Sequence, residues 1–397
     1  MLRGMKRLVC LDGLRGVLAV YVMLSHTMPF APMPGWLHWL FQHGGAAVDV
    51  FFILSGMVIV QSLASFEYRA LPFLTARVAR IYPVFLVVFA FAVAIQPLAT
   101  SFEGMAWIGQ DSVARYLWSG GWPDDWALGI ATHLTMTHGL FPDGFSSAIW
   151  VRFLGTSWSL STEWQFYVLA LLLLYRLGAQ RMAVLFLAIA AGYACWDAAT
   201  PDTWHFSRAF LPNKAEYFAL GIISARLVRE GRQAANSYLA VLAATLALCV
   251  CRGGVDKLLP PLLWTACFAA QAVAFGPRQW GSLVETPLRW LAMLLQSRPF
   301  VWLGGISYCL YLVHEPLERL LGLSLASLMH GNAALFTAIW IPGSIALPVL
   351  AAWPLHRWIE VPALRAGRAL ARQGLDTARR GPRLAAPLQS MRRVNVQ

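Results

Sequence analysis

Long apolar runs alternate with short polar segments along most of the chain. An apolar run of about 17 to 25 residues is long enough to cross the hydrocarbon core of a bilayer as a helix. The sequence has ten such runs, at about 12–29, 46–64, 82–99, 158–176, 181–197, 209–228, 236–251, 259–276, 300–322 and 334–355. This pattern predicts an all-α integral membrane protein, a bundle of about ten transmembrane helices.

Basic residues between the runs predict how the bundle is oriented. Three of them lie in residues 3–7, before the first run, and no Lys or Arg occurs between Arg15 and Arg69. Because cytoplasmic loops are enriched in Lys and Arg, the N-terminus is expected in the cytoplasm and the loop 30–45 outside. Ten crossings would return the C-terminus to the cytoplasm.

Three segments depart from the simple alternation. Residues 100–157 are rich in Trp, Gly and Asp, and are expected to form an outward excursion with an interfacial or re-entrant piece at 126–142. The stretch 283–297 is predicted to be an amphipathic interfacial helix. The domain division follows: residues 1–362 form one membrane domain, and residues 363–397 a basic, disordered cytoplasmic tail.

Composition supports the membrane assignment and excludes other classes. Of 397 residues, 58% are hydrophobic and 13% charged, and the mean hydropathy is +0.57, far from the values of a soluble domain. The net charge of +12 reflects basic residues beside apolar runs, so nucleic acid is not an expected partner. The six cysteines show no metal-ligand spacing, and the first run is expected to be a retained span rather than a cleaved signal.

Charged and histidine side chains inside a bilayer are costly, so each one needs an explanation. Arg15 and His26 both lie in the first run, separated by ten residues. On a helix the two would point to the same side, about 16 Å apart along its axis. The complete set of candidates at this depth is Arg15, His26, Asp49, Glu163, Lys214, Glu216 and His314.

Each candidate has a chemical and a structural interpretation. The imidazole of His26 could be a general base or a transient acyl carrier, or only a hydrogen-bonding group between helices. Arg15 could bind phosphates or a developing oxyanion, or be a charge at the cytoplasmic edge. Asp49 and Glu163 could orient His26 or pair with an arginine. His314 lies in HEPLE, which lacks the second histidine of a zinc-binding H-E-x-x-H motif.

Five stretches in order resemble the acyltransferase 3 family of bacterial membrane acyltransferases. They are LDGLRGVLAVYVMLSH, GGAAVDVFFILSGMVI, FLTARVARIYPVF, SWSLSTEWQFYVLALLLL, and LGGISYCLYLVHEPL followed by HRWIEVP. The resemblance extends from Leu11 to Pro362. It implies a ten-span inner-membrane enzyme that moves an acyl group, often acetyl from acetyl-CoA, to a hydroxyl of a carbohydrate such as an exopolysaccharide or O-antigen.

The resemblance also implies site residues. Arg15 and His26 would be the functional pair, and Arg77 and Arg80 a basic motif on the cytoplasmic side. Glu163 would be the acid of the S-L-x-x-E element, although this chain has Trp164 where many relatives have a second Glu. Acyl-CoA would be the donor substrate, with no permanently bound cofactor and no metal.

These observations lead to one hypothesis and two alternatives. Arg77, Arg80 and Arg15 would engage the phosphates of acyl-CoA, and transfer to a carbohydrate or glycolipid acceptor would occur at His26, with Asp49 or Glu163 holding the imidazole. A glycan or lipid transporter or flippase would also show intramembrane histidines and carboxylates, without any covalent chemistry. An inactive scaffold in a polysaccharide-synthesis machinery is the third possibility.

Overall fold

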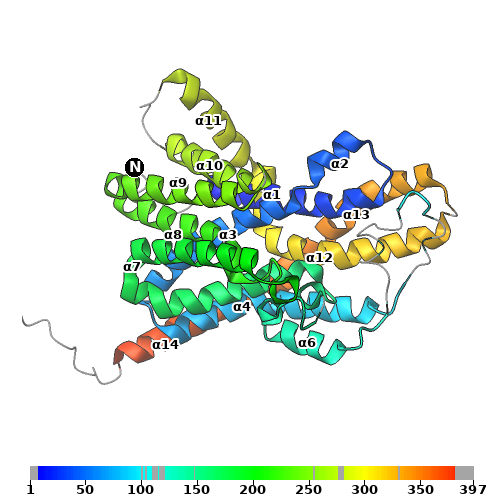
Figure 1. The fold of residues 1–397 in the computed structure, drawn as a ribbon, viewed down its shortest axis with the longest axis horizontal. Coiled ribbons are helices and arrows are strands. Elements are labelled where there is room, and N and C mark those ends of the chain that lie inside the picture. The colour runs from blue at the N-terminus through cyan, green and yellow to red at the C-terminus, as the bar shows by residue number, and fades with distance from the viewer. Residues whose placement is uncertain are drawn as a thin grey trace, which may run out of the picture.

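A computed structural model describes residues 8–99, 102, 105–109, 115, 121–146, 148–253, 255–275, 281–329 and 331–380 (Figure 1). No strand occurs within these ranges. The helices are α1 (Val9–Thr27), α2 (Gly35–Phe41), α3 (Gly44–Ser65), α4 (Ala70–Ile95), α6 (Trp126–Leu134), α7 (Trp158–Ala199), α8 (Ala215–Glu230), α9 (Ala235–Cys251), α10 (Leu259–Phe275), α11 (Ser282–Leu295), α12 (Arg298–Leu328), α13 (Ala333–Pro354) and α14 (Val361–Arg380).

Helix α1 lies in the middle of the bundle and packs along α12, with α3 and α10 on its other sides (Figure 1). Two glycines allow the α1–α12 contact to be close. A Cβ on Gly16 would lie 2.5 Å from the carbonyl oxygen of Phe300, and a Cβ on Gly304 would lie 1.9 Å from that of Asp12. Small residues permit such backbone approach between membrane helices. Gly16 and Gly304 therefore allow α1, which carries Arg15 and His26, to lie directly against α12.

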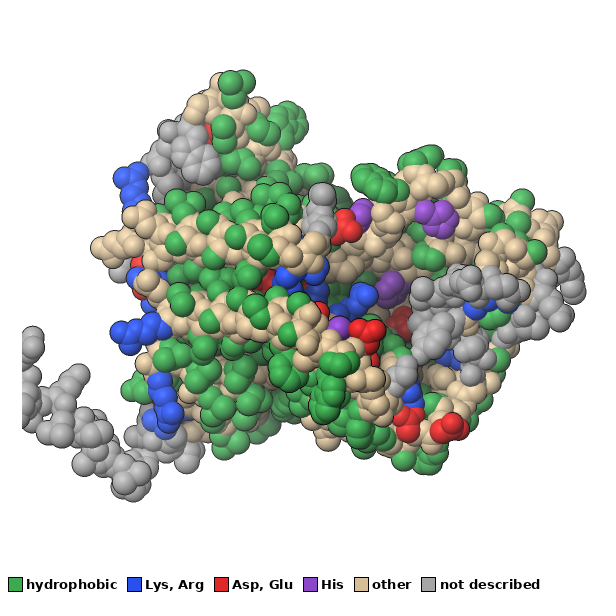
Figure 2. Space-filling model, viewed as in Figure 1, with side chains coloured by type: hydrophobic (Ala, Val, Ile, Leu, Met, Phe, Trp, Pro, Cys, Tyr) green, Lys and Arg blue, Asp and Glu red, His purple; other side chains and the backbone are tan. Residues whose placement is uncertain are grey.

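The predicted helical character is confirmed, and each of the ten predicted spans lies mostly on a helix within the described ranges. Among the described residues, six helical segments are long and apolar enough to cross a membrane: Val9–Phe30, Gly35–Ser65, Ala70–Ile95, Gly155–Ala199, Leu211–Cys251 and Ala333–Asp376. Several apolar helices thus make this a multi-pass membrane protein. Hydrophobic side chains cover the outer faces of α7 to α10 (Figure 2). The number of crossings and the side on which the termini lie stay predictions.

Two of these segments hold two predicted spans each. Helix α7 turns at Gly178, whose φ of 71° and ψ of 167° are not helical. This region of backbone space suits glycine, which has no Cβ to clash. The predicted spans 158–176 and 181–197 lie on the two sides of this turn. In the second segment, Gly231 at φ 66° separates α8 from α9.

Helix α12 is absent from the apolar set because it carries charges in its second half. Glu318 and Arg319 are 3% and 8% exposed, so both are inside the protein. Glu318 accepts a hydrogen bond from Thr27 Oγ1 at 2.8 Å, and Arg319 donates to the side chain and carbonyl of Gln96. A polar helix of this kind is stable at the centre of the bundle because its charged groups have protein partners.

The shorter predicted elements have clear counterparts. Helix α6 occupies part of the predicted 126–142 piece and has nine residues, about 13 Å, which is too short to cross a bilayer. Helix α11 corresponds to the predicted interfacial helix at 283–297. It leaves Leu283 and Trp290 exposed and buries Glu285, which pairs with Arg289 at 2.6 Å.

The predicted disordered tail is wrong for residues 363–380. Helix α13 continues through a π-helical stretch, Leu355–Glu360, into α14, which lies along α4 (Figure 1). Gly367 permits this contact, because a Cβ there would lie 2.2 Å from that of Ala79. The tail residues 381–397 lie outside the described ranges.

Candidate active site

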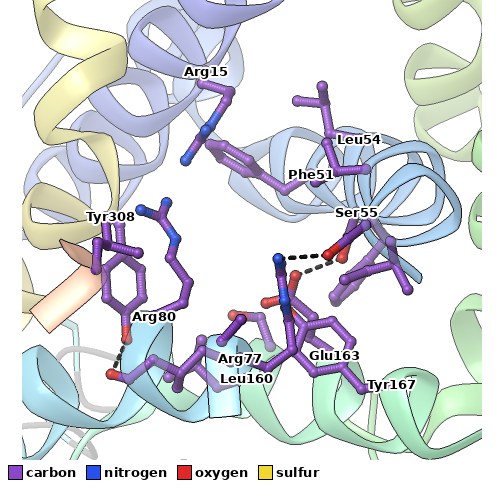
Figure 3. A pocket seen from close by; sticks show the side chains of 18 of the residues that line it. Arg15, Phe51, Leu54, Ser55, Arg77, Arg80, Leu160, Glu163, Tyr167 and Tyr308 are labelled. Carbon is purple, nitrogen blue, oxygen red and sulfur yellow. Dashed lines mark hydrogen bonds between the residues drawn. The ribbon is translucent and has the colours of Figure 1, made fainter. Parts of the chain in front are cut away.

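A cavity of about 640 Å³ lies between α1, α3, α4, α7, α12 and α14. Its wall carries five arginines and one carboxylate: Arg15, Arg77, Arg80, Arg368, Arg372 and Glu163. We call this cavity the arginine pocket. It brings together Arg15, Arg77, Arg80 and Glu163, which the sequence singled out in three distant stretches. Arg15 points into it from α1, and Arg77 and Arg80 from α4 (Figure 3).

Arg77 and Arg80 are in helix α4, which begins at Ala70 rather than near residue 82 as predicted. Arg77 Nη2 donates to Ser62 Oγ at 2.9 Å, and its guanidinium lies 5.6 Å from the ring centre of Phe73. Arg80 is paired with Glu360, a residue only 1% exposed. Both guanidinium groups are therefore held in fixed positions at the pocket wall.

Arg15 differs from Arg77 and Arg80 in its contacts. Among the described residues, Arg15 makes no hydrogen bond and no ion pair. Its five N–H donors remain free for a group inside the pocket. A guanidinium with free donors in such a cavity can bind an anion.

Glu163 is tied to the pocket wall and not to a histidine. Its Oε1 accepts a hydrogen bond of 2.5 Å from Ser55 Oγ (Figure 3). Asp49 is likewise occupied, since its Oδ1 lies 2.6 Å from Lys214 Nζ. Neither carboxylate is hydrogen-bonded to His26, so the predicted support of that imidazole by Asp49 or Glu163 is not what the structure has.

His26 is instead bonded to His314. His314 Nε2 lies 2.9 Å from His26 Nδ1, and the ring centres are 5.0 Å apart. His314 is fully buried in α12, whereas His26 is exposed. We call these two residues the histidine pair. The sequence singled out both residues but gave no sign that they meet, because 288 positions separate them.

The histidine pair lies outside the arginine pocket, and Tyr311 stands between the two. Tyr311 lines the pocket, and its ring centre is 6.2 Å from that of His314. Its hydroxyl donates to the carbonyl of Thr156 at 3.0 Å and is 2.9 Å from Ser159 Oγ. The histidine pair therefore lies next to the arginine pocket, on the other side of Tyr311.

Arg208, beside the histidine pair, has a role that the sequence did not indicate. It lies between α7 and α8, with its guanidinium 5.5 Å from the ring centre of Trp150 and 5.9 Å from that of Trp158. Within the described ranges it has no hydrogen bond or ion pair. Arg208 is exposed and Trp150 is half-buried, whereas Trp158 is buried beneath them against Phe52.

The sequence did not indicate three further residues of this region, because they follow the last apolar run: Glu360, Arg368 and Arg372. The spacing of Leu364, Arg368, Arg372 and Leu375, all of which line the pocket, is that of one helix face. That periodicity was the available signal for α14. Glu360 also lies within the HRWIEVP stretch.

One group of side chains within the described residues has the proximity of metal ligands: Cys309, His356 and Glu360. Its atoms already bond one another. Glu360 Oε2 accepts from His356 Nδ1 at 2.7 Å and from Cys309 Sγ at 3.3 Å, while Oε1 accepts from Arg80. We assign this cluster to fixing Glu360 under Arg80.

The structure is a multi-pass helical bundle with a cationic pocket next to an exposed histidine. Comparison with known proteins identifies the class. A family model described as an acyltransferase domain matches residues 8–357, so the chain belongs to the acyltransferase 3 family that the motifs indicated. The protein is thus an acyltransferase that transfers groups other than aminoacyl groups.

Curated relatives agree with this assignment. Acyltransferase MdmB of Streptomyces mycarofaciens is 28% identical over 90% of this chain and 92% of its own length. BcsY of Komagataeibacter xylinus, named as a proposed membrane-bound transacylase, is 30% identical over 77% of this chain and 72% of its own. No solved structure matches the chain.

Proposed function

We propose that this protein transfers an acyl group, with acetyl the first candidate, from acyl-CoA to a hydroxyl of a carbohydrate or glycolipid at the bacterial inner membrane. Exopolysaccharide and O-antigen are acceptors of the expected class, and the polysaccharide-synthesis machinery is the expected partner. The observation that carries this proposal is the arginine pocket beside the histidine pair.

The arginine pocket suits the nucleotide end of coenzyme A, which carries a diphosphate and a 3′-phosphate. Five arginines against one carboxylate leave a strong excess of positive charge on the wall. Guanidinium groups bind phosphate oxygens through paired, charge-assisted hydrogen bonds. Arg15 would take one phosphate group without giving up an existing bond, since it has no ion pair among the described residues.

The histidine pair suits the chemistry of transfer. The acyl group would pass Tyr311, which lies between the arginine pocket and the histidine pair, to reach His26. His26 would then either take the proton of the acceptor hydroxyl during direct attack on the thioester, or accept the acyl group and pass it on. In both routes the new ester C–O bond forms, the C–S bond breaks, and CoA leaves as a thiol.

The acceptor would approach from the side on which His26 is exposed. Arg208 and Trp150 lie there, and aromatic faces stack on sugar rings. Trp150 and Arg208 fall within the segments 100–157 and 197–212.

An acetylation assay with the intact protein tests the proposal. Proteoliposomes containing the full chain receive acetyl-CoA labelled in the acetyl group, together with surface glycan from cells that lack the gene. We expect base-labile label in the glycan, dependent on the protein, and mass spectrometry should find the same ester missing from those cells. Equal ester content with and without the gene would contradict the proposal. A transporter would move glycan across the membrane and leave no label on it.

A further inference from the structure

The hydrogen bonds of the histidine pair determine which ring nitrogen carries each proton. His314 Nδ1 lies 3.1 Å from the carbonyl oxygen of Leu310. A carbonyl oxygen can only accept, so His314 Nδ1 carries the proton. In the neutral ring, Nε2 then has a lone pair and no proton. The 2.9 Å contact between His314 Nε2 and His26 Nδ1 is therefore donated by His26 Nδ1–H.

The bond between the two rings also fixes the proton of His26. With its proton on Nδ1, neutral His26 has an unprotonated Nε2. Among the described residues nothing is hydrogen-bonded to that nitrogen, and the side chain is exposed. We propose that His314 is a positioning residue that fixes the tautomer of His26, so that Nε2 of His26 is the nitrogen that reacts. This inference rests on the proposed function.

The surroundings keep both rings in the neutral form that this chain of bonds requires. The nearby carboxylates on α12 have other partners: Glu315 accepts from the backbone N–H groups of Gly155 and Thr156, and Glu318 from Thr27. No carboxylate is hydrogen-bonded to either histidine within the described part of the chain.

A neutral partner gives the reaction a specific character. When the acceptor oxygen forms its bond to the acyl carbon, His26 Nε2 takes the hydroxyl proton. Because no carboxylate stabilises the resulting imidazolium, that proton is readily given to the CoA sulfur as the C–S bond breaks. His314 thus holds the orientation of a proton carrier and does not become charged itself.

Two amide variants at position 314 form the test. In His314→Gln the side-chain oxygen can occupy the place of Nε2 and accept from His26 Nδ1–H. In His314→Asn the shorter side chain ends near the place of Nδ1, where only Leu310 is within reach. His314→Leu removes both functions. The assay is acetyl transfer in proteoliposomes, corrected for the amount of protein.

We expect kcat to fall about 10- to 100-fold in the Asn and Leu variants, the usual cost of losing an orienting partner, with an unchanged KM for acetyl-CoA. The Gln variant should recover most of this loss. Equal activity of the Gln, Asn and Leu variants, whether high or low, would overturn the proposal, as would recovery by Asn and not by Gln.

A second readout does not depend on turnover. ¹⁵N NMR of histidine-labelled protein distinguishes protonated from unprotonated ring nitrogens, and the spectra of His26→Ala and His314→Gln assign the signals. We expect an unprotonated Nε2 on His26. If wild-type protein transfers no acetyl group but shows this signal, the proposed function fails and the tautomer assignment stands. A protonated Nε2 on His26 would refute the assignment directly.

Discussion

The two ends of helix α1 present opposite kinds of environment. Near Arg15, positive charge is in excess, and guanidinium groups line a cavity with free donors. Near His26, the acids have specific partners, since Asp49 pairs with Lys214 and Glu318 accepts a hydrogen bond from Thr27, and the exposed group is an imidazole. The proposed function assigns anion binding to one end and proton transfer to the other.

The difference follows from how each charge is partnered. Arginines stay protonated at any ordinary pH, so the groups around Arg15 act through constant charge. The imidazole at the other end acts through a lone pair, which requires that nearby acids be kept away from it. Binding and chemistry can therefore be altered separately, and four substitutions test that separation.

The largest effect is expected at His26. His26→Ala should lower kcat for acetyl transfer about 10²- to 10⁴-fold, because the proton acceptor is lost, while acetyl-CoA still binds. Donor binding can be measured as thermal stabilisation of the protein by acetyl-CoA. Full activity of this variant at matched protein level would show that the His26 side chain has no role in the reaction.

Lys214 is expected to matter for stability rather than chemistry. Lys214→Met leaves Asp49, which is 6% exposed, without its ion-pair partner and should cost about 3 to 5 kcal/mol of unfolding free energy. The double variant Asp49→Leu with Lys214→Met should recover most of that loss. If the double variant is stable but inactive, Asp49 acts in the reaction and the proposed division of roles is wrong.

Arg15→Lys tests whether the fork of the guanidinium matters. Lysine keeps the charge and loses paired hydrogen bonding, so kcat/KM for acetyl-CoA should fall about tenfold. Arg298→Lys, at an exposed arginine on α12 outside the pocket wall, serves as the control. Wild-type kinetics in Arg15→Lys would mean that Arg15 contributes only its positive charge and no paired hydrogen bonds.

The smallest effect is expected on α14. Arg368→Gln should raise the KM for acetyl-CoA about two- to fivefold, the range for one exposed charge contact, and less at high salt. Arg365 is on the same helix, is exposed and does not line the pocket. An equal change in Arg365→Gln would mean that α14 contributes only general charge.

Much of the fold was predictable because the bilayer imposes one simple requirement. Apolar length determines where helices lie, so each of the ten predicted ranges lies mostly on a helix, although α4 begins twelve residues before its range. The sequence was less informative where a helix is polar. Arginines occur at helical spacing in the first turns of α4 and throughout α14, and their charge suggested loop or disorder. In the folded protein these two helices pack against each other.

The site was predictable in its residues and not in its pairing. Arg15, Arg77, Arg80 and Glu163 were singled out by type and motif, and the structure brings them to one cavity. The partner of His26 could not be found in the same way. Orienting groups are usually carboxylates, and the side chain in contact is another histidine, reached only through the packing of α1 on α12.

Glu360 lies beyond the end of the region that matches the family model. The region shared with the family stops at residue 357, whereas the side chain that fixes Arg80 and the helix that closes the pocket come after it. A protein trimmed at residue 357 would lose Glu360 together with most of the HRWIEVP stretch. It would also lose α14, whose side chains line the arginine pocket, so the matched region ends before the pocket wall does.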